Sequence, residues 1–106
     1  MRFIYWFIDL FRGNFGGLRS PQWSKTRRAY MKLHPVSEIS GSKNNLEVHH
    51  KKSFSRNPEL ENDLTNLLTV TRNEHFIICH LEDWKSENEN IVEDAKIWRE
   101  KIIHRP

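Results

Sequence analysis

The chain has 106 residues, of which 37% are hydrophobic and 11% aromatic. This is enough for one small domain with a modest core and too little for two. The net charge of +3 conceals a segregation by sign, because positions 19 to 56 hold nine basic residues against two acidic ones, whereas positions 57 to 106 hold six against eleven. The basic stretch predicts a polyanion partner, and the alternative is a segment that balances the acidic half within the fold.

The N-terminal run MRFIYWFIDLF superficially resembles an export or membrane segment. It is too short to span a bilayer, contains Asp9 and precedes no small-residue cleavage site, so we expect no stable membrane insertion. We predict an apolar helix or extension over positions 1 to 18 that packs on the domain at 19 to 106 or on a second subunit. The side chains that could line its apolar face are Phe3, Phe7, Leu10 and Phe11. Peripheral membrane contact is a minor alternative.

A helix is predicted over Gln22–Leu33, because Ser20-Pro21 resembles a helix start and His34-Pro35 should end it. The expected inward residues are Trp23, Ala29, Tyr30 and Leu33. The expected outward residues are Lys25, Arg27, Arg28 and Lys32. The outward face of this helix would therefore be basic.

Further elements are predicted downstream of this helix. The segment GSKNN is typical of a turn, which makes Leu46–His49 a short strand, and an irregular loop follows over 53–65. After the apolar run Leu67–Val70, Asn73 is a candidate cap for a helix. That helix would carry His75, Phe76, Cys79 and His80. A last packing helix over Ile91–Ile103 would bury Val92, Ala95, Trp98 and Ile102.

Cys79 is the only cysteine of the chain. An intramolecular disulfide is therefore impossible, and the chain suits a reducing compartment such as the cytoplasm. A metal site made of four thiolates cannot be built from this chain either.

Two adjacent histidines, His49 and His50, stand at the end of the predicted strand in LEVHH. Neighbouring side chains of a strand point to opposite faces, so the two imidazoles cannot serve one packing surface. A neutral imidazole is a good ligand for a divalent ion, and a second imidazole near its working pKa is a good general base. The downstream side chains that could orient the base or complete a metal site are Asn66, His75 and His80. Any one of these histidines alone would ordinarily be structural, so the prediction depends on the whole set.

These motifs resemble those of the HNH endonucleases. The similar stretches are LEVHH, PELENDLTNLLTV and NEHFIICH, and the likeness runs over positions 19 to 106. The flanks RSPQWSKTRRAYMKLHP and HLEDWKSENENIVEDAKIWREKI are similar to those of small stand-alone HNH proteins of phages and bacteria. The resemblance implies an α+β fold, namely a ββα-metal (HNH) finger with flanking helices. It also implies a metal-dependent endonuclease that cuts one or both strands of DNA with little sequence preference.

The resemblance also implies roles for particular residues. His49 takes the place of the first metal ligand, and His75 takes the place of a later one. His50 matches the general base that accepts a proton from the attacking water, which suggests that activity falls below roughly pH 6.5, its unperturbed pKa. Asn66 matches the motif asparagine, which in different family members orients the base through its backbone or contacts the metal.

A third metal ligand lies one helical turn after the last histidine in some family members. Here that position is Cys79, with His80 next to it, and either residue could bind metal, support the ligands or belong to the core. The implied cofactor is one divalent ion, with Mg²⁺, Mn²⁺, Ni²⁺ and Zn²⁺ as candidates. The residues expected to hold the DNA backbone are Arg27, Arg28, Lys51 and Lys52. A second copy of the chain and a phage packaging machine are further partners that remain open.

The chain departs from the family pattern at the structural zinc. Many members hold that zinc with two Cys-x-x-Cys pairs, but here the first pair is Ser37 and Ser40 and the second is Thr71 and Glu74. Hydroxyls are poor zinc ligands compared with thiolates, so we expect no structural zinc and a fold held by packing and hydrogen bonds. The candidates for a replacement core are Trp23, Trp84, Trp98 and the apolar N-terminus.

The missing cysteines also raise an alternative function, a non-catalytic DNA-binding module derived from an HNH nuclease. The presence of His50 and Asn66 argues against this alternative. A structural zinc-binding interaction domain is a third reading, and it is disfavoured because its ligand positions hold Ser, Thr and Glu.

Overall fold

The computed structural model describes residues 19–106, so the helix or extension predicted for positions 1 to 18 lies outside the described residues. The helices are α2 (Trp23–Leu33), α3 (Arg72–Glu74) and α4 (Ile91–Ile103), and α3 continues into a π-helical turn over His75–Cys79. The strands β1 (Leu46–His50) and β2 (Leu67–Thr71) form a two-stranded antiparallel sheet. The described part is therefore a small α+β domain, and none of its helices is long and apolar enough to cross a membrane.

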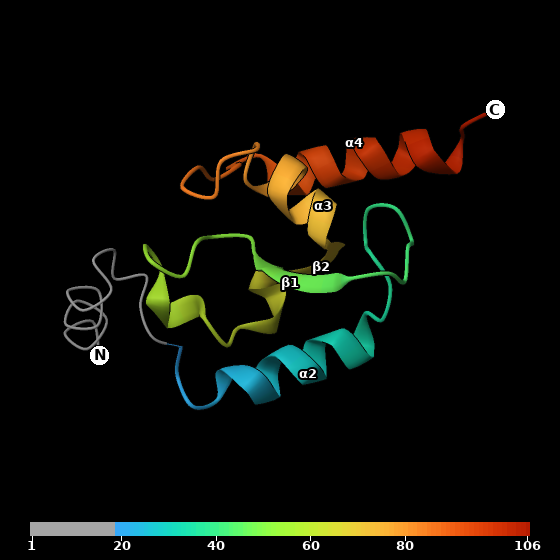
Figure 1. The fold of residues 1–106 in the computed structure, drawn as a ribbon. Helices are drawn as coiled ribbons and strands as arrows, with labels where there is room; N and C mark the ends of the chain where they lie inside the picture. Colours follow the sequence, from blue (N-terminus) through green and yellow to red (C-terminus); the bar gives the residue numbers. More distant parts are fainter. Residues whose placement is uncertain (1–18) are drawn as a thin grey trace.

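The sheet lies between two helical layers. Figure 1 shows α2 on one side of β1 and β2, and α3 with α4 on the other side. Because both faces are covered, β2 is buried from Leu67 to Val70. In the antiparallel register His49 lies opposite Leu68 and His50 lies opposite Leu67. The main core, on the α4 side, consists of Ile39, Leu68, Val70, Cys79, Ile91 and Ala95.

Helix α2 starts one residue later than predicted, with Gln22 at its N-cap. Tyr30 is buried as predicted, but Ala29 and Leu33 are exposed, so the prediction of an inward position for these two residues is wrong. The inward stripe runs through Trp23, Arg27 and Tyr30, which are spaced three or four residues apart, and Arg27 is half-buried rather than outward.

Helix α4 has the predicted bounds, and Ala95 is buried as predicted. Ile91 supplies the other fully buried position, whereas Val92 and Trp98 are about half exposed. Trp84 is similarly exposed, so the prediction that Trp84 and Trp98 build a replacement core is wrong. A two-stranded sheet is too narrow to cover more than one stripe of the helix that packs on it.

The helix after β2 is capped by Thr71, so the prediction of Asn73 as its cap is wrong. The Oγ1 of Thr71 accepts a hydrogen bond from the backbone N–H of Glu74, 3.1 Å away, and the Glu74 carboxylate accepts one from the backbone N–H of Thr71 at 2.8 Å. This reciprocal capping box lets the chain pass from strand to helix without a loop. The histidines at both ends of the following turn are therefore placed directly beside the sheet.

The four positions at which zinc cysteines would stand in the HNH pattern form a hydrogen-bonded cluster, which we call the Ser37–Glu74 network. The fully buried Ser37 hydroxyl donates to the Glu74 carboxylate at 2.5 Å. The same hydroxyl oxygen accepts the backbone N–H groups of Ile39 and Ser40, both at 3.0 Å. The Glu74 oxygen that accepts from Ser37 also accepts from Thr71. The network thus joins the segment before β1 to the start of α3.

Candidate metal centre

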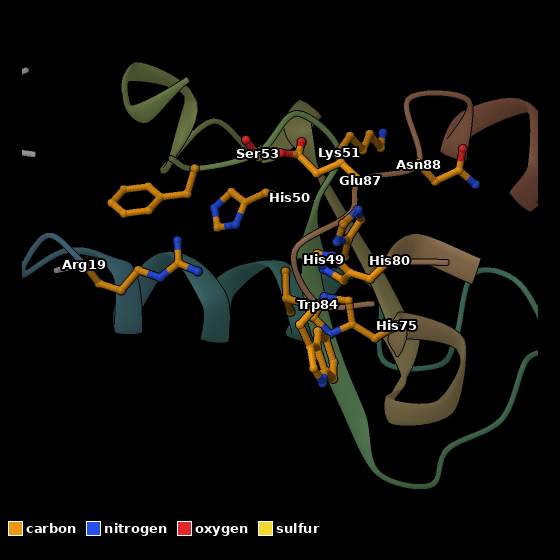
Figure 2. A pocket seen from close by; sticks show the side chains of 12 residues that line it. Arg19, His49, His50, Lys51, Ser53, His75, His80, Trp84, Glu87 and Asn88 are labelled. Atoms are coloured by element: carbon orange, nitrogen blue, oxygen red, sulfur yellow. The ribbon is translucent and has the colours of Figure 1, made fainter. Parts of the chain in front are cut away.

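Three imidazoles converge on one side of the sheet, and we call them the imidazole cluster. His49 comes from β1, and His75 and His80 stand at the two ends of the π-helical turn. A ring nitrogen from each histidine lies within 4.8 Å of one from each of the others. Figure 2 shows the three side chains together, with Trp84 beside them. Three imidazole nitrogens facing one point form a set that could hold a transition-metal ion.

The π-helical turn determines which downstream side chain joins the cluster. The backbone N–H of His80 donates to the carbonyl oxygen of His75 at 3.0 Å, so this turn closes between residues five apart. The extra residue brings His80 next to His75. Cys79 is instead fully buried in the main core, where burial and, to a smaller extent, Glu74 raise the pKa of its thiol to about 12. Of the two candidates for a third ligand, the structure therefore brings His80, and not Cys79, to the cluster.

Two of the three imidazoles are oriented by hydrogen bonds from their Nδ1 atoms. The Nδ1–H of His75 donates to the Glu47 carboxylate at 2.8 Å, and the Nδ1–H of His80 donates to the carbonyl oxygen of Ser86 at 2.7 Å. Both acceptors fix the ring tautomer and leave the Nε2 lone pair for a ligand. A carboxylate or carbonyl behind a metal-binding histidine is the usual support for such a ligand.

Glu47 is a residue of the candidate site that the sequence reasoning missed. It also accepts from Arg72 at 2.8 Å. Burial acts to raise the pKa of Glu47, but the hydrogen bonds from His75 and Arg72 outweigh it and hold the pKa below its usual value. The signal was present in the sequence, because Glu47 and His49 are two residues apart in a strand and so share one face.

The environment of His49 and His75 favours the neutral form of both imidazoles. Burial, followed by the neighbouring imidazoles, lowers the pKa of His49 to about 2. Burial also lowers the pKa of His75, although its hydrogen bond to Glu47 acts in the opposite direction. A metal ligand must offer an unprotonated nitrogen, so this environment favours cation binding.

His50 points to the other face of the sheet, as the strand alternation predicts. Its ring packs on Trp23 with centroids 4.5 Å apart, and in Figure 2 it stands apart from the imidazole cluster, towards Arg19. Its Nε2–H donates to the carbonyl oxygen of Glu61 at 3.0 Å. A carbonyl can only accept, so in the neutral ring the proton is on Nε2 and Nδ1 carries the lone pair. Burial, followed by the charge of Arg19, lowers the pKa of His50 to about 4, below the expected 6.5.

Asn66 makes its contacts with the chain that follows β1. Its Oδ1 accepts the backbone N–H of Lys52 at 2.9 Å, and its Nδ2 donates to the Lys52 carbonyl at 3.1 Å. Its own backbone carbonyl accepts the N–H of Lys51 at 2.7 Å. These three bonds tie the end of β1 to the start of β2, so Asn66 positions the segment that carries His49 and His50.

A cavity of about 270 Å³ is lined both by the imidazole cluster and by His50, although His49 and His50 point to opposite faces of the sheet. Of the predicted DNA contacts, Lys51 lines this cavity and Lys52 lines a neighbouring hollow. Arg27 and Arg28 lie on α2 and are not among its lining residues. The lining residues that the sequence reasoning did not assign to a site are Arg19, Val48, Ser53, Phe54, Trp84, Glu87 and Asn88. Apart from Val48, which belongs to β1, these residues come from loops whose path depends on tertiary contacts, so no local pattern indicated them.

No family model, curated protein or solved structure matches this chain. The chemistry of the site therefore has to follow from its own geometry.

Proposed function

We propose that this chain is a metal-dependent HNH endonuclease that hydrolyses DNA phosphodiester bonds with little sequence preference. The observation that carries the proposal is the arrangement of four imidazoles around one cavity. Three of them converge, and His75 and His80 keep their Nε2 atoms for a ligand. The fourth, His50, has its Nε2 bonded to a carbonyl and its Nδ1 available as a base.

The order of the elements supports the same proposal. Two antiparallel strands are followed without a loop by a helical segment, and the histidines lie at the end of the first strand and in that segment. This arrangement is what a ββα-metal finger requires, with the metal ligands between sheet and helix. The Ser37–Glu74 network supports the proposal further, because it offers hydrogen bonds where the family pattern would offer zinc thiolates.

His49, His75 and His80 would hold the ion. When bound, a divalent ion would polarise the scissile phosphate and stabilise the charge that develops on the leaving oxygen. Imidazole nitrogen suits Zn²⁺ and Ni²⁺, whereas Mg²⁺ prefers oxygen ligands. The three-imidazole set therefore favours Zn²⁺ or Ni²⁺ over Mg²⁺.

His50 would act as the general base. Its Nε2–H is fixed by the Glu61 carbonyl, so the proton of an attacking water would go to Nδ1. The depressed pKa of His50 keeps this nitrogen unprotonated at neutral pH. Asn66 would contribute indirectly, by tying the chain after β1 in place.

Basic residues would hold the DNA backbone. Lys51 and Lys52 directly follow β1 and would contact phosphates near the cavity. Arg27 and Arg28 on α2 would contact flanking DNA. Contacts to phosphate carry no sequence information, which agrees with a nuclease of low sequence preference.

A supercoiled plasmid is the direct test of this function. The purified chain is stripped with a chelator, and Mg²⁺, Mn²⁺, Ni²⁺ or Zn²⁺ is then added back separately. We expect no cleavage after stripping and nicked or linear DNA on metal addition, with Ni²⁺ or Zn²⁺ more effective than Mg²⁺. DNA binding without cleavage under every metal would instead support the non-catalytic DNA-binding module.

A further inference from the structure

Trp84 is a half-exposed aromatic residue at the edge of the imidazole cluster. Its ring centroid lies 5.2 Å from that of His75 and 5.0 Å from that of His80, and 47% of the residue remains accessible. Figure 2 shows the indole directly beside these imidazoles. A large ring packed on one side and open on the other offers a surface on which another planar ring can stack.

Trp84 also lines two overlapping hollows. One is the imidazole cavity, and the other is a hollow of about 370 Å³. Besides Trp84, the residues that line both are Arg19, Ser53, Phe54, His80 and Glu87. Two cations, Arg19 and Lys85, line the second hollow. A carboxylate, that of Glu87, lies there as well, but it is ion-paired with Arg56 at 3.8 Å.

An aromatic surface bordered by cations is the combination that binds single-stranded nucleic acid. The bases stack on the rings and the cations follow the backbone. Here the surface adjoins the proposed ligands His75 and His80, so a base on Trp84 would belong to a nucleotide close to the scissile phosphate.

The turn that presents Trp84 has an unusual backbone. Leu81 and Glu82 both have positive φ angles, of 54° and 65°, a conformation that residues with a Cβ rarely adopt. Hydrogen bonds hold the turn, because the N–H of Glu82 donates to the Phe76 carbonyl at 2.9 Å and that of Asp83 donates to the His80 carbonyl at 3.0 Å. Such strain is retained where the surrounding structure imposes it, often at functional sites. The turn thus places the backbone of Trp84, and ring contacts with His75, Phe76 and His80 hold its indole.

We propose that Trp84 is a stacking platform for a nucleobase next to the scissile phosphate, and that the preferred substrate is single-stranded DNA. This inference rests on the proposed nuclease function and specifies its substrate. A base in a duplex must first be unpaired and unstacked before it can reach the indole, whereas a base in a single strand is already free to do so. Every base has a π-face, so a stacking contact is also consistent with low sequence preference.

Binding of a fluorescent single-stranded oligonucleotide and of its duplex tests this inference, measured by anisotropy in chelator so that the strands stay intact. The variants are Trp84→Ala, Trp84→Phe and Trp98→Ala. Trp98 is a matched control, because it is also 47% exposed but lies on α4 and is not among the residues lining either hollow.

We expect the parent chain to prefer the single strand. Trp84→Ala should lose about tenfold in single-strand affinity and most of that preference, as removal of one stacking ring does elsewhere. Trp84→Phe should keep most of the affinity, and Trp98→Ala should bind like the parent. Zn²⁺ affinity, measured by calorimetry, should be the same for Trp84→Ala and the parent.

Two results would overturn the inference. One is a Trp84→Ala variant that binds the single strand as tightly as the parent does. The other is a Zn²⁺ affinity that falls along with DNA binding, since Trp84 would then act by holding the imidazoles. Cleavage of plasmid and of single-stranded DNA by the metal-loaded parent is scored separately. If the parent cuts DNA but Trp84→Ala binds unchanged, only the stacking inference fails; if the parent never cuts, the nuclease proposal fails whatever the binding shows.

Discussion

The imidazole cluster and the Ser37–Glu74 network meet in one short helical segment, where Glu74 directly precedes His75, and they use their polar atoms differently. In the network, the Ser37 hydroxyl donates once and accepts twice, and one Glu74 oxygen accepts from both Ser37 and Thr71. In the cluster, only the Nδ1 atoms of His75 and His80 are bonded to the chain, and their Nε2 atoms remain for a ligand. The network therefore uses its polar atoms to hold two chain segments together, whereas the cluster leaves ring nitrogens available for a metal ion.

In small domains, metal-binding residues often serve both to hold the fold and to carry out the chemistry. In a domain with both a structural and a catalytic metal, chelation would damage fold and activity together. Here the fold relies on hydrogen bonds around Ser37 and on the core beneath α4. Stability and chemistry should therefore respond to different substitutions.

The largest effect is expected at His50. His50→Ala should lower the cleavage rate by roughly 10²- to 10⁴-fold, the usual span for a lost general base. Metal affinity should stay close to that of the parent, because the Nε2 of His50 is bonded to Glu61 and not directed at the imidazole cluster. Rates are measured on supercoiled plasmid, and the exposed His104 gives the control variant His104→Ala. A His50→Ala variant that cuts like the parent would remove His50 from the mechanism.

The second effect concerns the Ser37–Glu74 network. Glu74→Ala should lower the free energy of unfolding by about 3 kcal/mol, because it leaves the buried Ser37 hydroxyl and the Thr71 N–H without their charged acceptor. Urea denaturation measures this change, and the exposed Glu93 supplies the control Glu93→Ala. Chelation of the parent should lower the melting temperature only slightly. A melting temperature that collapses on chelation would show that a metal holds the fold.

The third effect is a dependence of stability on pH in the chelated protein. The pKa of His50 is near 6.5 when unfolded and about 4 when folded, so the unfolded chain binds more protons between these values. Its contribution is fully present above pH 6.5 and is lost as the pH falls towards 4, by about 2 kcal/mol at pH 5. Denaturant titrations at pH 7 and pH 5 measure the loss. His50→Ala should lose less of its free energy of unfolding between pH 7 and pH 5 than the parent does. Part of the loss should remain, because the pKa of His49 is also lowered. A parent equally stable at both values would contradict this account.

The smallest effect concerns the predicted DNA contacts. Lys51→Ala should lower the slope of log affinity against log salt by about 0.7 to 0.9, the value for one lost phosphate contact. Because Lys51 lines the cavity, short and long DNA should show the same change. Replacing Arg27 and Arg28 together should change only the slope for long DNA, since both residues lie on α2 and neither lines the cavity. Identical salt dependence in all variants would place the DNA elsewhere.

Periodicity and alternation predicted much of this domain. The bounds of α4 and the opposite directions of His49 and His50 follow from periods of 3.6 and 2, which a sequence displays directly. The choice between Cys79 and His80 could not be predicted, because it depends on a turn closed between residues five apart and not four. The prediction for Ala29 and Leu33 was wrong because apolar character alone does not determine which side of α2 faces the narrow sheet. The stripe that does face it includes the charged Arg27.

Metal titration tests the central claim most directly. Calorimetry with Zn²⁺ on the stripped parent should give one ion per chain, and His49→Ala should lose most of that affinity because it removes a ligand of the imidazole cluster. Glu47→Ala should weaken binding by about 10- to 100-fold, since the ring of His75 loses its oriented partner. Unchanged binding in His49→Ala and Glu47→Ala, or no binding by the parent, would contradict a metal centre at these histidines.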